Sequence, residues 1–371
     1  MAKNGFKIID CDMHIHEPHD LWQRYTDPKF RDRAPVGLNR HFRDIGVEFG
    51  GKPVAALADM PFVPGFKALR DAINVKRYSE EMEQGFDSKS QLSAMEKEGL
   101  DRAIMFPTRG LLIMLLEGLD GPLSAAIARA YNDWLHDFCR IAPDRMFGSA
   151  MTPVHDITLA VGETRRAVTE LGFKGIFLPN GHVNGRRWND PHYEPLWAEC
   201  QRLGIPVGFH GGGKVDGMLK PYTARFTEFQ SLNHPMTMMP VVVDIIAGGV
   251  TERFPELKFG FFESNCSWVP WFLNRIHEYA ELFGSAECLD LKLEPAEYFK
   301  RQCYASVEAD EFTAKYLPDF GFEDNIVFST DYPHTDAKFP NAVDAFMDLP
   351  FSDQSRRKYL WDNCAKLYNI T

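Results

Sequence analysis

Short apolar runs recur along most of this chain, and stretches with helical periodicity separate nearly all of them. The runs include IIDCDMH, RAIMF, KGIFLP, IPVGF and NIVFS. Most are apolar throughout rather than alternating, which is typical of parallel strands that are buried on both faces. Counting from the N-terminus gives eight candidate strands. Eight strand–helix units predict an α/β fold, the (β/α)8 TIM barrel.

A doubly wound open sheet is the alternative architecture. It would be favoured by a GxGxxG motif after the first strand, and the sequence has none there. The chain has 371 residues, which one barrel can hold because TIM barrels run from about 250 residues to more than 400 with insertions. We therefore expect a single domain over residues 1–371.

Residues 19–87 do not follow the strand–helix pattern and are rich in Arg, Pro, Gly and aromatic residues. A structureless loop of this length would be unusual in a compact domain, so we expect an insertion after the first strand that contains short helices. Two interpretations stay open for it: a lid over a site, or an insertion without a role in function.

The composition limits the partners and the compartment. The net charge is −11, and no run of Lys or Arg compensates it, which argues against nucleic acid and against an anionic membrane surface. The seven cysteines are scattered without a CxxC pair, and this favours a reducing cytoplasm over a disulfide framework. We find neither an export signal nor an apolar run long enough for a membrane helix. We therefore expect a cytoplasmic protein with a small-molecule partner, and a homo-oligomer is one alternative for its quaternary state.

The first strand carries a concentration of metal-ligating residue types. Asp10, Asp12, His14 and His16 alternate along IIDCDMHIHEP, and side chains two residues apart on a strand point to the same face. Carboxylate oxygen and imidazole nitrogen bind zinc and similar metals at roughly 2.0 to 2.2 Å. The segment therefore predicts a site for a divalent metal ion.

Other polar residues follow later strands at the same end, where TIM barrels place their active sites. An unpaired carboxylate would be costly to bury there, and a metal ion would satisfy it. Some of these residues also have a purely structural interpretation: a packed core histidine for His210, a salt bridge for Glu263, and a helix cap for His234. The residues that end strands two, four, five, six and eight are Thr108 and Arg109, Asn180, His210, Glu263, and Asp331 with His334 just after it.

Four motifs together resemble those of a known family. DMHIHEP, GFHGG, FSTDYPH and LWDNCAKLYNI occur in this order along nearly the whole chain. They resemble the amidohydrolase superfamily, in particular the branch with aminocarboxymuconate semialdehyde decarboxylase and γ-resorcylate decarboxylase. The resemblance implies a TIM barrel that holds one divalent ion, zinc, manganese or iron, between a first-strand pair, His210 and Asp331.

The chain departs from the family pattern at two places. The first-strand pair can be Asp12 with His14 or His14 with His16, and the EP that follows His16 favours the first choice, as in similar proteins of the DxHxxEP type. His16 is the second candidate. The related decarboxylases are expected to have a histidine at the end of strand six, where this chain has Glu263. Lys174 lies at the beginning of strand four, the wrong end for a carbamate ligand.

The resemblance implies a metal-dependent hydrolase or non-oxidative decarboxylase that acts on a small, aromatic or unsaturated carboxylate. We expect Asp331 to move the proton and a carboxylate-binding role for Arg109 or for an arginine of the insertion. Two other classes stay open: a two-metal, di-iron oxygenase in which Glu263, His16, Glu17 and His234 hold the second ion, and a non-catalytic metal-binding protein. The remaining candidates are Glu263 and His234 for catalysis and Asn180, Trp268 and His334 for substrate binding.

Overall fold

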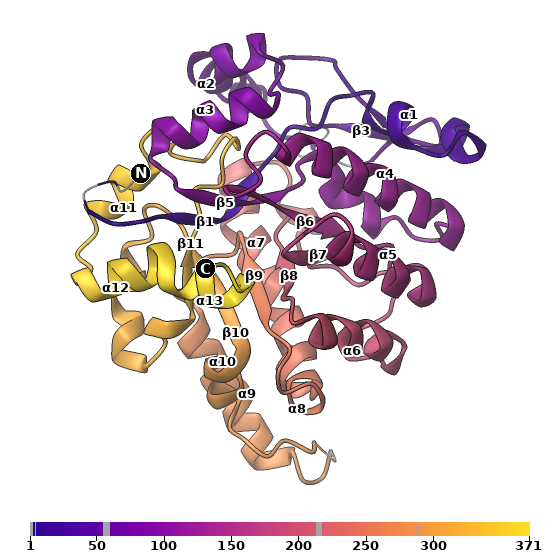
Figure 1. Ribbon diagram of the computed structural model, residues 1–371. Coiled ribbons are helices and arrows are strands. Elements are labelled where there is room, and N and C mark those ends of the chain that lie inside the picture. Colours follow the sequence, from indigo (N-terminus) through magenta and orange to yellow (C-terminus); the bar gives the residue numbers. More distant parts are fainter. Residues whose placement is uncertain (1–2, 4, 55–59, 213–216, 288) are drawn as a thin grey trace.

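Eight parallel strands form the barrel, and this confirms the predicted fold class (Figure 1). The computed structural model describes residues 3, 5–54, 60–212, 217–287 and 289–371. Each strand pairs with the next one in the order β1-β5-β6-β7-β8-β9-β10-β11. The strands are β1 Ile9–His14, β5 Arg102–Phe106, β6 Met146–Met151, β7 Gly175–Pro179, β8 Val207–His210, β9 Phe259–Phe262, β10 Cys303–Val307 and β11 Ile326–Phe328.

The barrel closes where β1 meets the segment that follows β11. The backbone N–H of His14 donates to the carbonyl of Tyr332 at 2.6 Å, and the hydroxyl of Ser329 donates to the carbonyl of Asp12 at 3.2 Å. The hydroxyl of Thr330 donates to the buried carboxylate of Asp10. These contacts hold the first and the last strand end side by side, so polar side chains from both reach one place.

Helices surround the strands (Figure 1). Helix α3 ends as the sequence predicts, because Gly99 adopts the left-handed conformation with φ 83°. The C-terminal helix α13 packs against β1 and β11. No helix of the described residues is both long and apolar enough to cross a membrane. The helices outside the insertion are α3 Ser88–Glu98, α4 Gly121–Cys139, α5 Ile157–Thr169, α6 Glu194–Leu203, α7 Phe226–Val242, α8 Val250–Arg253, α9 Val269–Phe283, α10 Pro295–Gln302, α11 Ala342–Met347, α12 Asp353–Arg357 and α13 Asn363–Tyr368.

The structure does not support the interpretation of His234 as a helix cap. Helix α7 begins at Phe226 and includes both Pro235 and Pro240, so His234 lies inside this helix. Residues Phe312–Phe320 form a 3-10 helix, and Pro318 lies within it.

The insertion after β1 contains short helices, as predicted, and a three-stranded antiparallel sheet. Residues 55–59 of this predicted segment lie outside the described residues. Figure 1 shows α2 and α3 beside one another at one edge of the barrel. The elements of the insertion are α1 Leu21–Tyr25, β2 Val36–Gly37, β3 Val47–Phe49, β4 Lys52–Val54 and α2 Pro64–Glu83.

Arg109 fastens this insertion to the barrel. Its side chain is buried and donates from Nη1 to the carbonyls of Leu38 and Gly46, both at 2.8 Å, and from Nε to the carbonyl of Glu17 at 2.8 Å. Nη2 lies 3.1 Å from Nε2 of His16. All three nitrogens of the guanidinium thus have contacts within the protein, and Arg109 also lines the cavity next to the metal centre. Its role as a carboxylate clamp stays a prediction.

We predict that Arg109→Ala destabilises the protein by roughly 3 kcal/mol, because several buried carbonyl groups lose their donor. Chemical denaturation measures this change, and faster amide exchange in residues 36–54 would locate it. Arg33→Ala is the control, since this arginine of the insertion has a side chain that is 58% exposed. Equal stability of the two variants would contradict the fastening role.

Candidate metal centre

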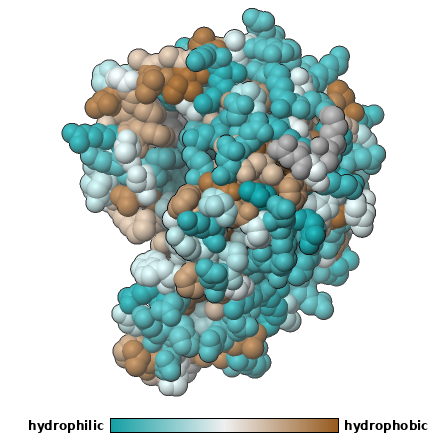
Figure 2. Space-filling view, turned by 90° about the vertical axis from the view of Figure 1, so that its left-hand side faces the viewer, coloured by the Kyte–Doolittle hydropathy of each residue, from teal (hydrophilic) through white to brown (hydrophobic). Residues whose placement is uncertain are grey.

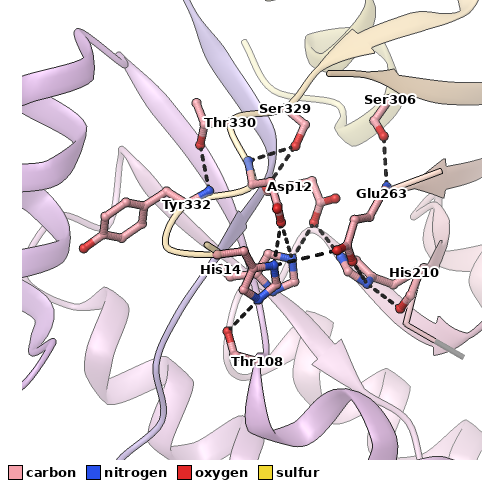
Figure 3. A network of polar contacts seen from close by, with 12 residues as sticks. Asp12, His14, Thr108, His210, Glu263, Ser306, Ser329, Thr330 and Tyr332 are labelled. Carbon is pink, nitrogen blue, oxygen red and sulfur yellow. Dashed lines mark hydrogen bonds and ion pairs between the residues drawn. The ribbon is translucent and has the colours of Figure 1, made fainter. Parts of the chain in front are cut away.

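Four side chains converge at one end of the barrel, and Figure 3 shows three of them, Asp12, His14 and His210. Asp12 and His14 come from β1, His210 ends β8, and Asp331 follows β11. Oδ1 of Asp12 lies 3.0 Å from Nε2 of His210 and 3.5 Å from Nε2 of His14. Nε2 of His14 is also 3.6 Å from Oδ1 of Asp331. The ligand atoms of Asp12, His14 and His210 lie close enough together to hold a single ion, and Asp331 meets His14 in a second group of ligand atoms.

Both imidazoles in this cluster are oriented by backbone carbonyls. Nδ1 of His14 lies 2.6 Å from the carbonyl oxygen of Pro107, and Nδ1 of His210 lies 3.0 Å from that of Gly211. A carbonyl only accepts hydrogen bonds, so each Nδ1 carries the proton and each Nε2 presents a lone pair. Such a bond to the second ring nitrogen is the usual support of a metal-binding histidine.

Several buried polar atoms of the cluster have no hydrogen-bond partner among the described residues. They are Oδ2 of Asp12, Nε2 of His14 and Oε2 of Glu263. Leaving a buried polar group unsatisfied costs about 1–3 kcal/mol, and more for a charged group. The donor set of carboxylates and neutral imidazoles fits a divalent cation, and a cation bound here would satisfy these atoms together.

A second group of ligand atoms overlaps the first. His14, Glu263, Asp331 and His334 also lie close enough to share an ion. Nδ1 of His334 is 2.7 Å from Oδ1 of Asp331 and 3.8 Å from Oε1 of Glu263. Nδ1 of His234 is 3.5 Å from the same glutamate oxygen. The two groups share His14, so they describe one polar centre.

Backbone strain marks two members of this centre. Glu263 has φ 49° and Asp331 has φ 55°, and residues other than glycine seldom adopt this left-handed conformation, Glu more seldom than Asp. Each directly follows the end of a strand or lies in the turn after it. Strain of this kind costs on the order of 1–3 kcal/mol and clusters at functional sites.

The electrostatics of the cluster favour an added positive charge. Burial raises the pKa of the Asp331 carboxyl well above its ordinary value, and the nearby carboxylates of Asp336 and Asp12 raise it further. Burial also raises the pKa of Glu263, together with the charge of Asp331. Crowded carboxylates thus resist ionisation together, and a bound divalent cation would reverse this trend.

Three histidines around the centre, His14, His234 and His334, are held neutral. Burial lowers the pKa of His14 far below its ordinary value, and His334 and His210 add to this effect. Burial likewise lowers the pKa of His234 and of His334 to about 3. For His210, burial opposes protonation, but the adjacent Asp12 carboxylate raises its pKa overall. Neutral imidazoles are the form that binds metal ions.

The structure separates His16 from the other first-strand candidates. Strand β1 ends at His14, and His16 stacks on Phe86 with ring centroids 4.9 Å apart. Burial lowers the pKa of its imidazole, and Arg109 adds to this effect. Glu17 also points elsewhere, since its carboxylate accepts from the backbone N–H groups of residues 108–110. Neither residue belongs to the groups whose ligand atoms meet.

Two residues predicted to bind substrate are used within the protein. Nδ2 of Asn180 donates to Oγ1 of Thr237 at 2.7 Å, and the indole N–H of Trp268 donates to the carbonyl of Ser264 at 2.8 Å. Neither lines the cavity next to the metal centre. His334 and His234 do line it.

Arg43 is a functional candidate that the sequence reasoning did not name. Its side chain is 5% exposed and lines the cavity, yet Nε and Nη2 have no hydrogen-bond partner among the described residues. The guanidinium lies over the ring of Tyr78, 5.6 Å from its centroid, and the backbone is strained at φ 52°. Only the general expectation of an arginine from the insertion pointed to it.

A cavity of about 1200 Å³ opens onto the centre. Glu263, His334, His234 and Thr108 line it together with residues of the insertion, whereas Asp12, His14 and His210 lie below its surface and are fully buried. A ligand in the cavity can therefore reach the centre from one side only. Such a concave site with a few convergent polar groups is typical of enzyme active sites.

Known proteins share this fold and parts of this sequence. Residues 9–370 match a protein-family model described as amidohydrolase. A 2-amino-3-carboxymuconate-6-semialdehyde decarboxylase of Dictyostelium discoideum is 27% identical over 207 residues, which are 56% of each chain. A γ-resorcylate decarboxylase of Rhodococcus jostii is 26% identical over 265 residues, which are 66% of this chain and 77% of the relative. The first of these matches thus spans little more than half of that relative.

Solved structures match over the whole chain. An amidohydrolase from Mycobacterium avium subsp. paratuberculosis superposes with a TM-score of 0.76 at 22% identity, over 99% of this chain and 98% of that one. A 5-carboxyvanillate decarboxylase from Novosphingobium aromaticivorans gives a TM-score of 0.71 at 20% identity, over 99% and 97% of the two chains. The latter structure contains manganese and 4-hydroxy-3-methoxy-5-nitrobenzoic acid.

A pair of variants separates the two first-strand assignments. We predict that His14→Gln removes most of the bound metal, because Nε2 of His14 points into the centre. His16→Gln should retain it, because His16 faces Arg109. Metal analysis of the purified proteins by plasma mass spectrometry gives the ratio of metal to chain. Loss of metal from the His16 variant with retention in the His14 variant would contradict this assignment.

Proposed function

Because the chain belongs to the amidohydrolase family, we propose that it is a metal-dependent, non-oxidative decarboxylase of an aromatic or unsaturated carboxylic acid. The observation that carries the proposal is the cavity that ends at a buried carboxylate–imidazole centre, beside the guanidinium of Arg43, whose Nε and Nη2 have no hydrogen-bond partner among the described residues. Relatives described as decarboxylases support this choice of reaction.

Asp12, His14, His210 and Asp331 would hold the metal ion. Two carboxylates and two imidazoles suit zinc, manganese and iron alike, and we propose manganese because one related structure contains it. When bound, a divalent cation supplies positive charge that polarises oxygen atoms of the substrate. We propose one ion rather than the pair of an oxygenase, because the two possible ligand groups share His14.

Arg43 is the group that we assign to substrate orientation. Its unpaired Nε and Nη2 can donate two parallel hydrogen bonds to an anionic oxygen pair, the geometry that arginine provides best. The burial of this guanidinium lowers its pKa from the ordinary value, so an anionic partner would relieve the cost of burying the charge. The ligand that satisfies Arg43 is therefore an acid.

Asp331 is the residue that we assign to proton transfer. Asp331 first takes up a proton from the solvent. The bond between the carboxylate carbon and the neighbouring carbon then breaks, its electron pair stays on the latter, and that carbon takes up the proton from Asp331 as carbon dioxide leaves. His334 orients the carboxyl group through its 2.7 Å contact with Oδ1. Proton transfer by a positioned side chain contributes typically 100- to 10,000-fold to the rate.

Hydrolysis is the second candidate reaction. Glu263 ends β9 where we expected a histidine in the decarboxylases, and a carboxylate at this position can accept a proton from an attacking water. A screen of hydroxybenzoates and unsaturated acids with manganese-loaded protein distinguishes the two reactions. Release of carbon dioxide supports decarboxylation, whereas turnover of a substrate to hydrolysis products without carbon dioxide supports the alternative.

We predict that Asp331→Asn lowers the rate of carbon dioxide release by at least about 100-fold, because the amide cannot deliver the proton. Circular dichroism should show an unchanged fold, and the metal content is measured alongside to separate loss of the acid from loss of the ion. Turnover near that of the unchanged protein would refute the assigned role.

We predict that Arg43→Met raises KM by about 10- to 100-fold, since a charged hydrogen bond contributes about 1.5–3 kcal/mol. Arg225→Met is the matched control, because Arg225 also lines the cavity but is 71% exposed and pairs with Glu228 at 3.0 Å. Steady-state kinetics on the best substrate of the screen gives both values. The same KM for both variants would argue against substrate binding by Arg43.

A further inference from the structure

The cavity is much larger and more apolar than a single-ring acid requires. Its volume of about 1200 Å³ exceeds the roughly 300–1,000 Å³ that is usual for sites that enclose drug-sized ligands. The polar groups next to the metal centre include Arg43, Thr108, Glu263 and His334, and most of the accessible lining of the cavity is apolar. An acid bound at these groups would therefore leave most of the cavity unfilled.

Much of the remaining wall is apolar, although charged side chains such as Arg225 and Glu228 also line it. The insertion, the segment after β5 and the beginning of α7 contribute the apolar side chains. Figure 2 shows a hollow in the surface with hydrophobic residues gathered beside it at the upper left of the view. The side chains that matter most here are Val47, Phe66, Ile73, Leu111, Leu115 and Phe226.

This apolar wall is a packed unit of the fold. Phe66 of the insertion stacks on Phe226 of α7 with ring centroids 4.2 Å apart, and Phe62 meets both rings edge-on. Phe62 and Phe229 belong to a small hydrophobic cluster that is separate from the main core. Aromatic packing of this kind contributes about 0.5–1.5 kcal/mol per pair beyond the buried area, so these ring contacts help to hold the wall together.

Part of this apolar surface is exposed to water. Val63 and Leu69 line the cavity and are 49% and 61% exposed. Exposed apolar surface that gathers around a hollow is typical of a ligand-binding groove. A ligand with an apolar part would cover this surface, whereas a small polar acid would not.

We infer that the substrate is amphipathic: an aromatic or unsaturated acid whose acidic end lies at Arg43 and the metal centre, and whose alkyl or aryl substituent of several carbons lies along the Phe66–Phe226 wall. This inference rests on the proposed function for the acidic end of the ligand. The inference about the apolar end of the ligand rests only on the shape and lining of the cavity.

Binding of 4-alkylbenzoates tests the inference without any turnover. These acids lack the ring hydroxyl groups of the substrates in the screen, and their alkyl chain can be lengthened from methyl to octyl. Calorimetric titration of the manganese-loaded protein should show Kd falling roughly fourfold for each added methylene, from the transfer free energy of one CH2 group. Over four carbons the gain should be on the order of 100-fold.

Two variants of helix α2 locate the effect. Ile73 lines the cavity and Val75 does not, although both are β-branched residues of the same helix. Ile73→Asn should weaken the octyl ligand by at least about fivefold and leave the methyl ligand unchanged. Val75→Asn should change neither, which controls for the effect of the amide on the helix.

The outcomes separate this inference from the proposed reaction. A Kd that does not fall with chain length, or that responds equally to both variants, would overturn the amphipathic substrate. A falling Kd supports it, whether or not carbon dioxide is released in the screen. If long-chain acids bind tightly and none of the hydroxylated or unsaturated acids loses carbon dioxide, the result supports an amphipathic acid as the ligand and contradicts the proposed decarboxylation.

Discussion

The burial of several carboxylates beside one another is the constraint on which this site depends. Asp12, Glu263 and Asp331 lie together at the end of the barrel, where water is largely excluded. Like charges this close are unfavourable in a poorly solvated place, and hydrogen bonds within the protein do not satisfy all of their atoms. A divalent cation resolves both problems at once. The imidazoles of His14 and His210 are already turned so that their lone pairs face the same point.

The barrel seam and the insertion position this centre from opposite sides. The contacts between β1 and the segment after β11 bring Asp12 close to Asp331, so the closure of the barrel also assembles the ligands. The buried Arg109 ties the insertion to the strand ends, and the insertion in turn places Arg43 next to the centre. In the proposed function, the strand ends provide the reactive groups and the insertion provides the groups that select the ligand.

The sequence predicted the strands well because parallel barrel strands are short, apolar and buried on both faces. It also indicated which end of the barrel carries the polar side chains, because polar residues directly follow those strands. It predicted less well where regular geometry ends. The twofold alternation that placed His16 beside His14 no longer applies after β1 ends at His14. Helix α7 contains two prolines, and its first turns were therefore not predicted as helical. His234 was for this reason expected to lie outside the helix. Arg43 lies in an insertion without periodicity, and its role depends on contacts between segments far apart in the chain.

The position of the metal ion is the central claim, and anomalous diffraction tests it most directly. Crystals of the manganese-loaded protein measured on both sides of the manganese absorption edge would show the ion without reference to any assumed ligand. We predict one peak per chain, surrounded by Asp12, His14, His210 and Asp331. The distances from the peak to their ligand atoms should be close to roughly 2.0–2.2 Å, the range of nitrogen and oxygen ligands in zinc sites. A fully loaded protein with its peak elsewhere, or with His16 among the ligands in place of Asp12, would contradict it.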